Sequence, residues 1–524
     1  MEELTRIMNN RNIGALTEPD QLPVAELLAR FFPGGTVIPS SLQWLDECLL
    51  GIADSPGQEQ FFAVGPSEPL VTGFAGLKAE LQNLDGNSLL TAAADVSGSR
   101  FLRTQLPHLN PRPLGLQPSF GFGDRLGLAT PGHAAAMHKF GQGMAPVFCQ
   151  QSIREMIRTD RSPDEVMSTA TWGAFRAGWQ HMVGADADHL KTFEDLENTA
   201  KAGFCFFTID PSDHVDQQAD NYSEVEVENK FQALLDDAIP GAESFLSLYD
   251  GKSFDLEGVK GELCFEAGPL KRAAVKYGRA LAHITAMTRH AESLMGDSGF
   301  DLEISVDETD QPTTVHEHLF LALELKRNQA QVTSLAPRFI GDFEKGVDFR
   351  GDMDAFVAAL RIHAAIASQY GPYKISLHSG SDKFSVYPPI AEACEGKFHV
   401  KTAGTSYLEA LRVVSRVAPD LFRDIVAFCR ERFPVDRATY HISASLENTP
   451  LAESLGPEQL EHLYLNEDNG RQLLHVTFGS VLTVCDGGKF RFKNDLLSIL
   501  RSESGLHEAF LVKHFGNHLS LLQR

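Results

Sequence analysis

Histidines and carboxylates gather at several points where an apolar run of this chain turns polar. His378 ends one such run and opens a glycine-containing loop up to Lys383, and similar polar ends fall at residues 184–189, 207–214, 305–308 and 399–404. Histidine with carboxylates in oxygen-rich surroundings suits Zn, Mn, Ni or Co, not a thiolate site. For a single histidine an ion-pair network without metal is the simpler interpretation. Two or more histidines together favour a divalent metal cation.

Strands that turn polar at their C-terminal ends are what a (β/α)8 barrel requires, because its active site is assembled there. Eight candidate strands alternate with helical patterns, which predicts a closed parallel sheet. They cover residues 114–121, 146–152, 182–188, 203–210, 302–308, 331–339, 373–379 and 397–403. The predicted fold class is therefore α/β, a (β/α)8 TIM-type barrel.

Residues two apart on a strand share a face. This pairs Asp186 with Asp188, Thr208 with Asp210, Ser305 with Asp307, Ser376 with His378, and His399 with Lys401. The residue between each pair is Ala, Ile, Val, Leu or Val. In a barrel the polar set would face the lumen and the apolar set the surrounding helices.

The rest of the chain divides around this barrel. Residues 1–112 mix short apolar runs with Pro and Gly turns and predict an N-terminal accessory α/β segment, more simply a packing layer on the barrel than a separate binding module. Residues 113–405 are predicted to form the barrel, with an insertion between strands four and five. Residues 406–524 predict a C-terminal helical extension that packs on the barrel.

Composition narrows the class of protein. The chain has 524 residues, is 43% hydrophobic and carries a net charge of −24, which argues against nucleic acid or an anionic membrane surface as partner. No apolar run approaches the length of a membrane span. The seven cysteines are scattered without a C-x-x-C pair, as in proteins of the reducing cytoplasm. Self-association into a homo-oligomer is compatible with this composition.

Two further motifs have a chemical and a structural interpretation. Gln150 and Ser152 end a strand with groups suited to sugar hydroxyls, although Ser152 is equally placed to cap the helix beginning at Ile153. The glycine-rich residues 121–127 do not match the G-x-G-x-x-G pattern that binds dinucleotides.

Together, residues 121–127, 150–152, 184–189, 208–214, 305–309, 338–346, 374–388 and 398–407 resemble the tagaturonate epimerase family of bacterial hexuronate catabolism. The resemblance runs from about residue 114 to the C-terminus. It implies a metal-dependent isomerase that interconverts D-tagaturonate and D-fructuronate. Some members are similar to enzymes used on the neutral ketohexoses tagatose and fructose.

The implied reaction restricts the mechanism. The two ketouronates differ at C4 while the ketone is at C2, so simple enolisation does not remove the C4 proton. Retro-aldol cleavage of C3–C4 followed by re-addition is favoured over transient oxidation at C4, because no dinucleotide pattern is visible. A metal would act as a Lewis acid, and a Schiff base on Lys401 is the alternative.

These considerations assign provisional roles. The expected metal ligands are His189, Asp307 and His378. His475 is a further expected ligand, because apolar residues flank it and the family resemblance includes it. The alternative is that His475 is a core histidine in a helix. Asp210 is expected to be the acid/base with a pKa raised by burial, and Asp188 is second choice. The expected substrate contacts are Gln150, Ser152 and Tyr407 for hydroxyls, and Arg338 and Lys401 for the C6 carboxylate.

Two other functions fit the same pattern. One is a metal-dependent aldolase or lyase that releases three-carbon fragments from ketouronates or ketohexoses. The other is a non-catalytic barrel that binds a sugar.

Overall fold

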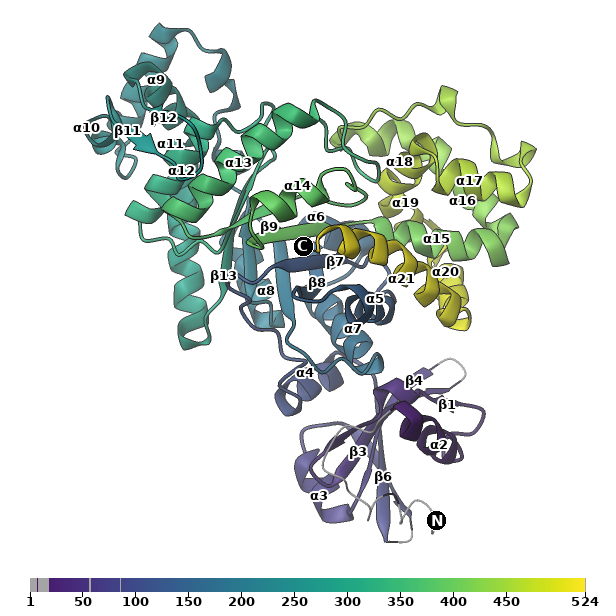
Figure 1. Cartoon of the computed structure of the whole chain (residues 1–524). Helices are drawn as coiled ribbons and strands as arrows, with labels where there is room; N and C mark the ends of the chain where they lie inside the picture. Colours follow the sequence, from purple (N-terminus) through teal and green to yellow (C-terminus); the bar gives the residue numbers. More distant parts are fainter. Residues whose placement is uncertain (1–6, 8–17, 56–57, 85, 524) are drawn as a thin grey trace.

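The computed structural model describes residue 7 and residues 18–55, 58–84 and 86–523, and Figure 1 shows their arrangement. Eight parallel strands close into a barrel in the order β10-β13-β14-β15-β16-β7-β8-β9. The strands are β7 (Ser119–Gly123), β8 (Ala145–Ser152), β9 (Gly184–Leu190), β10 (Phe206–Ile209), β13 (Asp301–Val306), β14 (Ser334–Pro337), β15 (Lys374–Leu377) and β16 (Phe398–Thr402). The predicted (β/α)8 barrel is confirmed, and each predicted strand overlaps one of these.

The first predicted strand lies too early. Residues 114–118 form a turn beneath the barrel, where the Asp301 carboxylate accepts hydrogen bonds from the backbone N–H groups of Leu114, at 2.6 Å, and Gly115, at 3.0 Å. The strand itself begins at Ser119. The apolar pattern alone does not reveal this carboxylate cap, which comes from a distant part of the chain.

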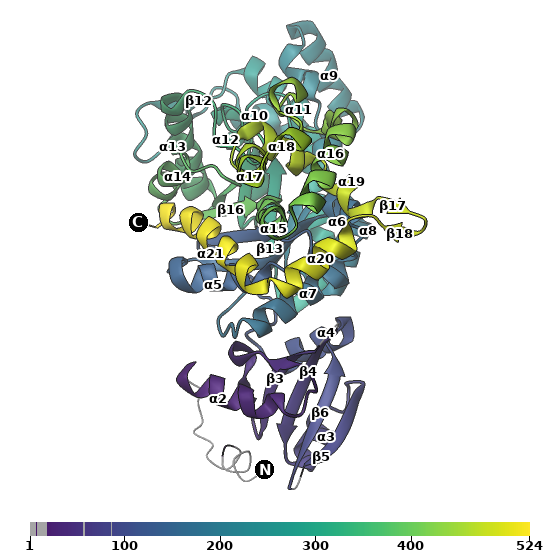
Figure 2. The same cartoon turned by 90° about the vertical axis from the view of Figure 1, so that its right-hand side faces the viewer.

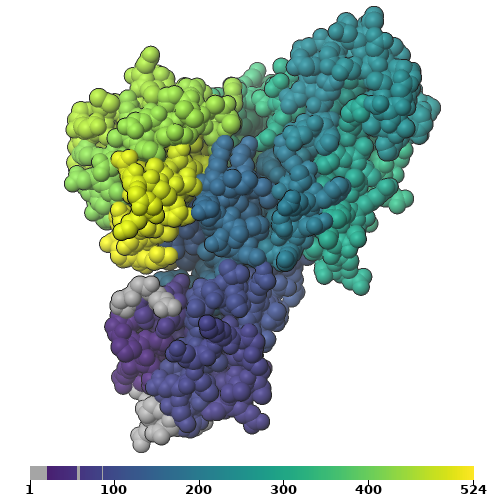
Figure 3. Space-filling view, turned by 180° about the vertical axis from the view of Figure 1, so that it is seen from behind, coloured from purple at the N-terminus to yellow at the C-terminus, as the bar shows by residue number. Residues whose placement is uncertain are grey.

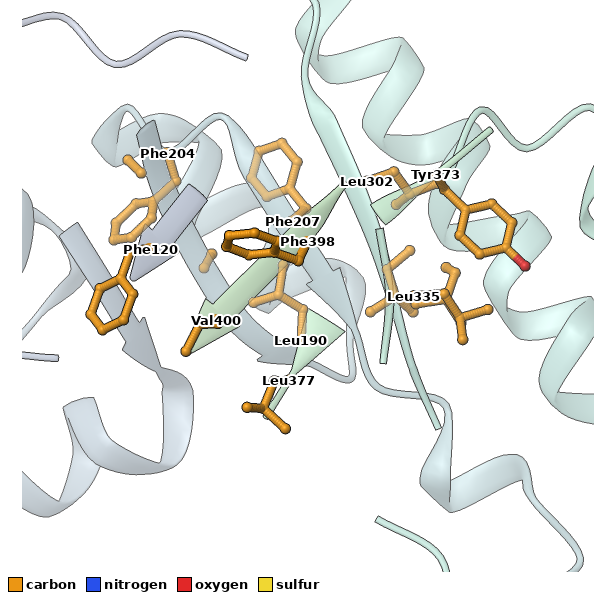
Figure 4. Close-up of a cluster of buried hydrophobic side chains, with 14 of the residues drawn as sticks. Phe120, Leu190, Phe204, Phe207, Leu302, Leu335, Tyr373, Leu377, Phe398 and Val400 are labelled. Atoms are coloured by element: carbon orange, nitrogen blue, oxygen red, sulfur yellow. The ribbon is translucent and has the colours of Figure 1, made fainter. Parts of the chain in front are cut away.

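Helices surround the barrel and cover its outer face (Figures 1 and 2). They are α5 (Thr130–Phe140), α6 (Ile153–Thr159), α7 (Pro163–Arg176), α8 (Phe193–Ala202), α11 (Ala267–Met295), α12 (Val315–Arg327), α13 (Met353–Tyr370), α14 (Tyr387–Ala393) and α15 (Thr405–Val417). Outward-facing strand residues such as Leu190, Leu377 and Val400 are at most 1% exposed and belong to the hydrophobic layer shown in Figure 4. Burial of this apolar layer holds the barrel and its helices together.

A segment between β10 and α11 projects from the barrel. It contains α9 (Glu224–Asp236), α10 (Phe245–Tyr249), β11 (Ser253–Asp255) and β12 (Glu262–Cys264). In the space-filling view of Figure 3 this teal lobe stands opposite the green and yellow C-terminal part, with the N-terminal lobe below.

The N-terminal lobe contains a six-stranded antiparallel sheet. Its elements are α2 (Glu18–Ala29), β1 (Thr36–Val37), β2 (Gln43–Leu45), β3 (Cys48–Ser55), β4 (Gln58–Gly65), α3 (Ser67–Gly73), β5 (Ala79–Leu84), β6 (Asn87–Ala93) and α4 (Val96–Gln105). Phe61 of β4 packs on Trp172 and Phe175 of α7, with ring centroids 6.0 Å apart in both pairs. Arg176 at the end of α7 contacts Glu59 at 2.6 Å. The lobe is therefore fastened to one barrel helix, away from the strand ends that carry the histidines.

The C-terminal extension consists mainly of helices. Its elements are α16 (Pro419–Asp436), α17 (Pro457–Leu465), α18 (Asp468–Val476), α19 (Phe478–Thr483), the hairpin β17 (Cys485–Asp486) and β18 (Lys489–Phe490), α20 (Lys493–Ser502) and α21 (Ser504–Leu521). Helix α21 lies along α5 on the side of the barrel, and Gln523 beyond it contacts Gln142 at 2.9 Å. Helix α18 carries His475 to the cavity at the strand ends. The domain limits at residues 112/113 and 405/406 stay predictions.

No helix within the described ranges is both long and apolar enough to span a bilayer.

Candidate active site

A cavity of about 290 Å³ opens at the C-terminal ends of the barrel strands. Its walls include Gln150 from β8, Asp188 and His189 from β9, His378 just after β15 and Lys401 from β16. The C-terminal extension adds further wall residues: Thr439, Tyr440, His441 and His475. The cavity therefore lies where this fold assembles active sites.

A β-bulge places two consecutive residues of β9 in this cavity. The register of β9 with β10 shifts by one residue between Ala187 and Leu190, and His189 has a φ of +54°. Strict alternation would point Asp188 and His189 to opposite faces, but both line the cavity, and Leu190 returns to the hydrophobic layer. Bulges commonly re-aim a side chain next to an active site in this way.

His378 lies between two carboxylates. Its Nε2 is 2.6 Å from Glu303 Oε1, and its Nδ1 is 3.1 Å from Asp307 Oδ1. Burial opposes a charge on this ring, but Asp307 and Glu303 outweigh burial and raise the pKa of His378 to about 10.

His189 has a similar environment. Its Nδ1 is 3.4 Å from Asp210 Oδ2 and its Nε2 is 3.7 Å from Asp188 Oδ1. Burial again opposes the charge, while Asp188 and Asp210 raise the pKa of His189 to about 9. The rings of His189 and His378 meet edge to face, with centroids 5.1 Å apart.

These residues fit a divalent metal. Ligand atoms of Asp188, His189 and His378 all lie within 4.8 Å of one another. Nδ1 of His378 is buried and, although Asp307 Oδ1 is 3.1 Å away, the two are not aligned for a hydrogen bond. Glu303 and Asp210 each contact one nitrogen of a histidine, as carboxylates behind metal-binding histidines do. The donors are nitrogen and oxygen, which suits the predicted Zn, Mn, Ni or Co.

His475 lies in the cavity wall but apart from this group. Its Nε2 is 3.4 Å from an Arg125 nitrogen. The residue lies in the last turn of α18. Burial, followed by the nearby Arg125 charge, holds the pKa of His475 well below its usual range. Within the described part of the chain, the groups whose ligand atoms meet within 4.8 Å do not include His475.

Lys401 is surrounded by carboxylates of the barrel lumen. Its Nζ is 2.8 Å from Asp186, 2.8 Å from Asp188 and 2.8 Å from Glu303. It also donates a hydrogen bond to Thr208 Oγ1 at 2.6 Å. Burial would lower its pKa, but the three carboxylates raise it well above its usual value. Its charge is thus already compensated inside the barrel, and its role as carboxylate anchor stays a prediction that this geometry does not favour.

The two acid/base candidates differ in position. Asp188 lines the cavity, whereas Asp210 is 2% exposed and accepts hydrogen bonds behind His189, including one from Ser212 N at 2.9 Å. The rise in pKa expected for Asp210 is wrong, and the pKa of Asp188 is not raised either. Burial does raise it, but His189 outweighs burial at Asp210, and His189, Lys401 and His378 do so at Asp188, so both pKa values are lowered.

The predicted substrate contacts also separate. Both amide atoms of Gln150 are buried without hydrogen-bond partners, and the residue lines the cavity. Ser152 lines the cavity too, and its Oγ caps α6 by accepting from Glu155 N at 3.2 Å. Arg338 lies in the wall just after β14. Tyr407 lies outside the cavity lining, in a second hydrophobic cluster where its ring packs near Phe478.

Three features in or behind the cavity wall were missed from the sequence. Glu303 shares its strand face with Ser305, so the two-residue alternation already pointed to it. Lys345, in the loop after β14, carried no comparable signal. The buried pair of Arg125 and Glu155, 2.8 Å apart, joins two distant segments and is invisible to local patterns.

A second histidine–carboxylate group braces the loop after β15. Asp382 contacts Arg471 at 2.8 Å and His514 at 3.3 Å. His518 uses both ring nitrogens: Nε2 accepts from Asp382 N at 3.1 Å, and Nδ1 donates to His514 O at 2.9 Å. With both nitrogens of His518 engaged, the group serves as a link between α21, α18 and this loop.

This link predicts a pH-dependent stability term. Burial opposes ionisation of Asp382, but Arg471, His514 and His518 lower its pKa to about 2. A depressed carboxyl pKa stabilises the fold above the unfolded value and loses that contribution as pH falls toward 2, here roughly 2 kcal/mol. Asp382→Asn should therefore lower the melting temperature clearly at pH 6 and less at pH 3. The exposed Asp420→Asn is the control, and an equal difference at both pH values would contradict the assignment.

The barrel, with histidines and carboxylates converging at its strand ends, defines a TIM-barrel enzyme. The chain matches the tagaturonate epimerase family over residues 39–522 and belongs to it. It is accordingly an isomerase, an epimerase that acts on a small sugar molecule. The family resemblance inferred from the motifs is confirmed.

Relatives agree over nearly the whole chain. A Thermotoga maritima protein named tagaturonate/fructuronate epimerase is 42% identical over 470 residues, covering 88% of this chain and 94% of that protein. A native crystal structure of fructuronate-tagaturonate epimerase from Cohnella laeviribosi has a TM-score of 0.87 at 33% identity, covering 96% of this chain and 99% of that one. Its complex with one glycerol also has a TM-score of 0.87 at 33% identity, covering 95% and 98%.

Proposed function

We propose that this protein interconverts D-tagaturonate and D-fructuronate by epimerisation at C4 with the help of a divalent metal. The observation that carries the proposal is the meeting of His189, His378 and Asp188 within 4.8 Å at the strand ends of a chain 42% identical to a tagaturonate/fructuronate epimerase. The neutral pair tagatose and fructose differs from these acids only in lacking the carboxylate, and forms the natural comparison.

We assign the metal to His189, His378 and Asp307, whose Oδ1 lies 3.1 Å from His378 Nδ1. Asp188, which also meets the two histidines within 4.8 Å, is left for proton transfer. When bound, a divalent cation would supply Lewis-acid stabilisation of negative charge on the C2 and C3 oxygens of the sugar. Glu303 and Asp210 would hold the two imidazole rings in place through their other nitrogens. His475 is assigned instead to the wall beside Arg125.

The proposed route is retro-aldol cleavage and re-addition. The C4 hydroxyl loses its proton, its oxygen becomes an aldehyde oxygen, and the electron pair of the C3–C4 bond passes into an enediolate over C2 and C3. The aldehyde fragment turns, and the enediolate carbon attacks its other face while the proton returns to the C4 oxygen. Every bond broken is remade, so the overall reaction is an isomerisation without an oxidant.

Asp188 is the carboxylate that we assign to the C4 proton. It lines the cavity beside His189, and a carboxylate in this position takes the C4 hydroxyl proton and returns it after re-addition. The unpartnered amide of Gln150 would bind sugar hydroxyls. Ser152 offers a second hydroxyl contact from the same strand end.

The test is incubation of the metal-loaded protein with D-tagaturonate. D-fructuronate should accumulate to an equilibrium mixture, also reached from D-fructuronate, with no free three-carbon product by NMR. Removal of the metal by a chelator should abolish turnover, and adding back Zn, Mn, Ni or Co in parallel should restore it with one of them. Accumulated three-carbon fragments would indicate a lyase, and no conversion of either acid or either ketohexose would favour a binding protein.

A further inference from the structure

Five lysine and arginine side chains line the cavity, and they differ in how their charges are met. Arg125 lies 2.8 Å from Glu155, and Arg154 lies 3.1 Å from Glu308. Lys401 is held by the three lumen carboxylates already described. Within the part of the chain that the structure describes, the two remaining cations have no carboxylate within 4.0 Å. They are Arg338 and Lys345.

The surroundings of these two side chains leave their charges available. The Arg338 Nε is buried and makes no hydrogen bond. The Lys345 Nζ donates to a neutral partner, Ser379 Oγ, at 2.5 Å. Burial, followed by repulsion from Arg154, lowers the pKa of Lys345 even though Asp307 and Glu308 lie near enough to oppose the shift. A negative group entering the cavity would be attracted to this pair.

The loop after β14 that carries both residues is held firmly. Lys383 is buried and donates from Nζ to the backbone carbonyls of Glu344, at 2.7 Å, and Val347. Arg471 donates to the carbonyl of Gly346 at 2.8 Å. The backbone on both sides of Lys345 is therefore held by buried lysine and arginine side chains, and the Lys345 side chain lies against Ser379, next to His378.

We propose that Lys345, together with Arg338, binds the carboxylate of the sugar acid and so makes the enzyme prefer uronates over neutral ketohexoses. The inference rests on the proposed function and goes beyond it by naming the residues that select the substrate class. A carboxylate that leaves water needs charge-assisted donors, and two uncompensated cations on one rigid loop provide them. Lys401 is already paired with the three lumen carboxylates, so the proposal does not require it to bind the sugar carboxylate.

The retro-aldol route gives this anchor a second use. Cleavage of C3–C4 leaves C6 on the aldehyde fragment, which must turn before re-addition. A carboxylate held at the loop keeps that fragment in the cavity, while the flexible stem of a lysine allows it to rotate.

The test compares Lys345→Met with the wild type on an acid and a neutral substrate. The kcat/KM for D-fructuronate should fall by about 30-fold or more, the value of a charge-assisted hydrogen bond, while that for D-fructose should change by less than about 3-fold. Lys345→Arg should recover part of the loss because it keeps the charge. If fructose turnover is too slow to measure, the inhibition constant of D-tagatose as a competitor of fructuronate conversion reports the affinity for the neutral sugar.

Three further variants complete the test. Arg338→Gln should shift the acid-to-neutral ratio in the same direction as Lys345→Met. Ser379→Ala removes the hydroxyl that positions Lys345 but keeps the charge, so it should shift the ratio less than Lys345→Met. Lys326→Met removes an exposed lysine at the far end of α12 and should change nothing. Equal losses on both sugars, or no loss on the acid, would overturn the inference while leaving the epimerase intact. A wild type inactive on both acids would instead overturn the proposed function.

Discussion

Replacing His378 with alanine should remove the bound divalent metal and lower kcat/KM for D-tagaturonate by about 10³-fold, because Lewis-acid stabilisation contributes several kcal/mol. His378 sits just after β15, with Asp307 at its Nδ1 and Glu303 at its Nε2. Removing the ring takes away a nitrogen ligand and also leaves the buried Glu303 and the partly buried Asp307 without the imidazole between them. Both effects weaken the site for the metal and for the reaction.

The measurement is metal content per chain by elemental analysis, together with initial rates after saturation with each candidate metal. His290→Ala is the matched control, because His290 pairs with Glu197 at 2.8 Å on the outer helices, away from the cavity. It should keep its metal and its activity. Full metal content in His378→Ala would exclude His378 as a ligand, whereas a wild type without bound metal would favour an ion-pair network.

The barrel and much of its lumen could be predicted because they depend on local regularities. Alternation along β16 puts His399 and Lys401 inside the barrel and Val400 outside, and the lysine does reach the lumen carboxylates. The same rule extends to Glu303, two residues before Ser305. Such patterns persist because one face of each strand meets the helices and the other meets the lumen.

The parts that escaped prediction depend on departures from regularity or on distant segments. The bulge at Asp188 and His189 brings two adjacent side chains to one cavity, which no periodic pattern anticipates. The same bulge sets His189 in front of Asp210, so that Asp210 supports a histidine and does not line the cavity. The sequence indicates that these carboxyl groups are buried, and burial alone raises a carboxyl pKa. The sequence does not show how close His189, His378 and Lys401 come to them, and these groups lower the pKa values.

The charge balance of the lumen illustrates the same limit. Lys401 and Lys345 are both lysines next to polar residues in the sequence, and local pattern does not distinguish them. The fold gives one of them three carboxylates at 2.8 Å and the other a serine hydroxyl. Which cation remains free for a substrate is therefore a property of the assembled barrel.

Replacing Lys401 with methionine should lower kcat/KM on acid and neutral sugars by a similar large factor, about 10²-fold or more, if a buried ion-pair network is lost. The change leaves Asp186, Asp188 and Glu303 without their shared cation. Breaking a buried pair of this kind costs about 3–5 kcal/mol, so the melting temperature should fall as well. The carboxylates would also repel one another beside His378 and disturb the orientation of its ring.

The same variant tests the Schiff-base alternative. The three carboxylates keep the Lys401 ammonium protonated, and a protonated amine is not a nucleophile. Borohydride treatment of the wild type during turnover should therefore give no sugar adduct on Lys401 by mass spectrometry. Lys401→Arg, which keeps the charge, should recover stability better than Lys401→Met. A trapped adduct would assign chemistry to Lys401, and a loss confined to the acid substrate would restore it as the carboxylate anchor in place of Lys345.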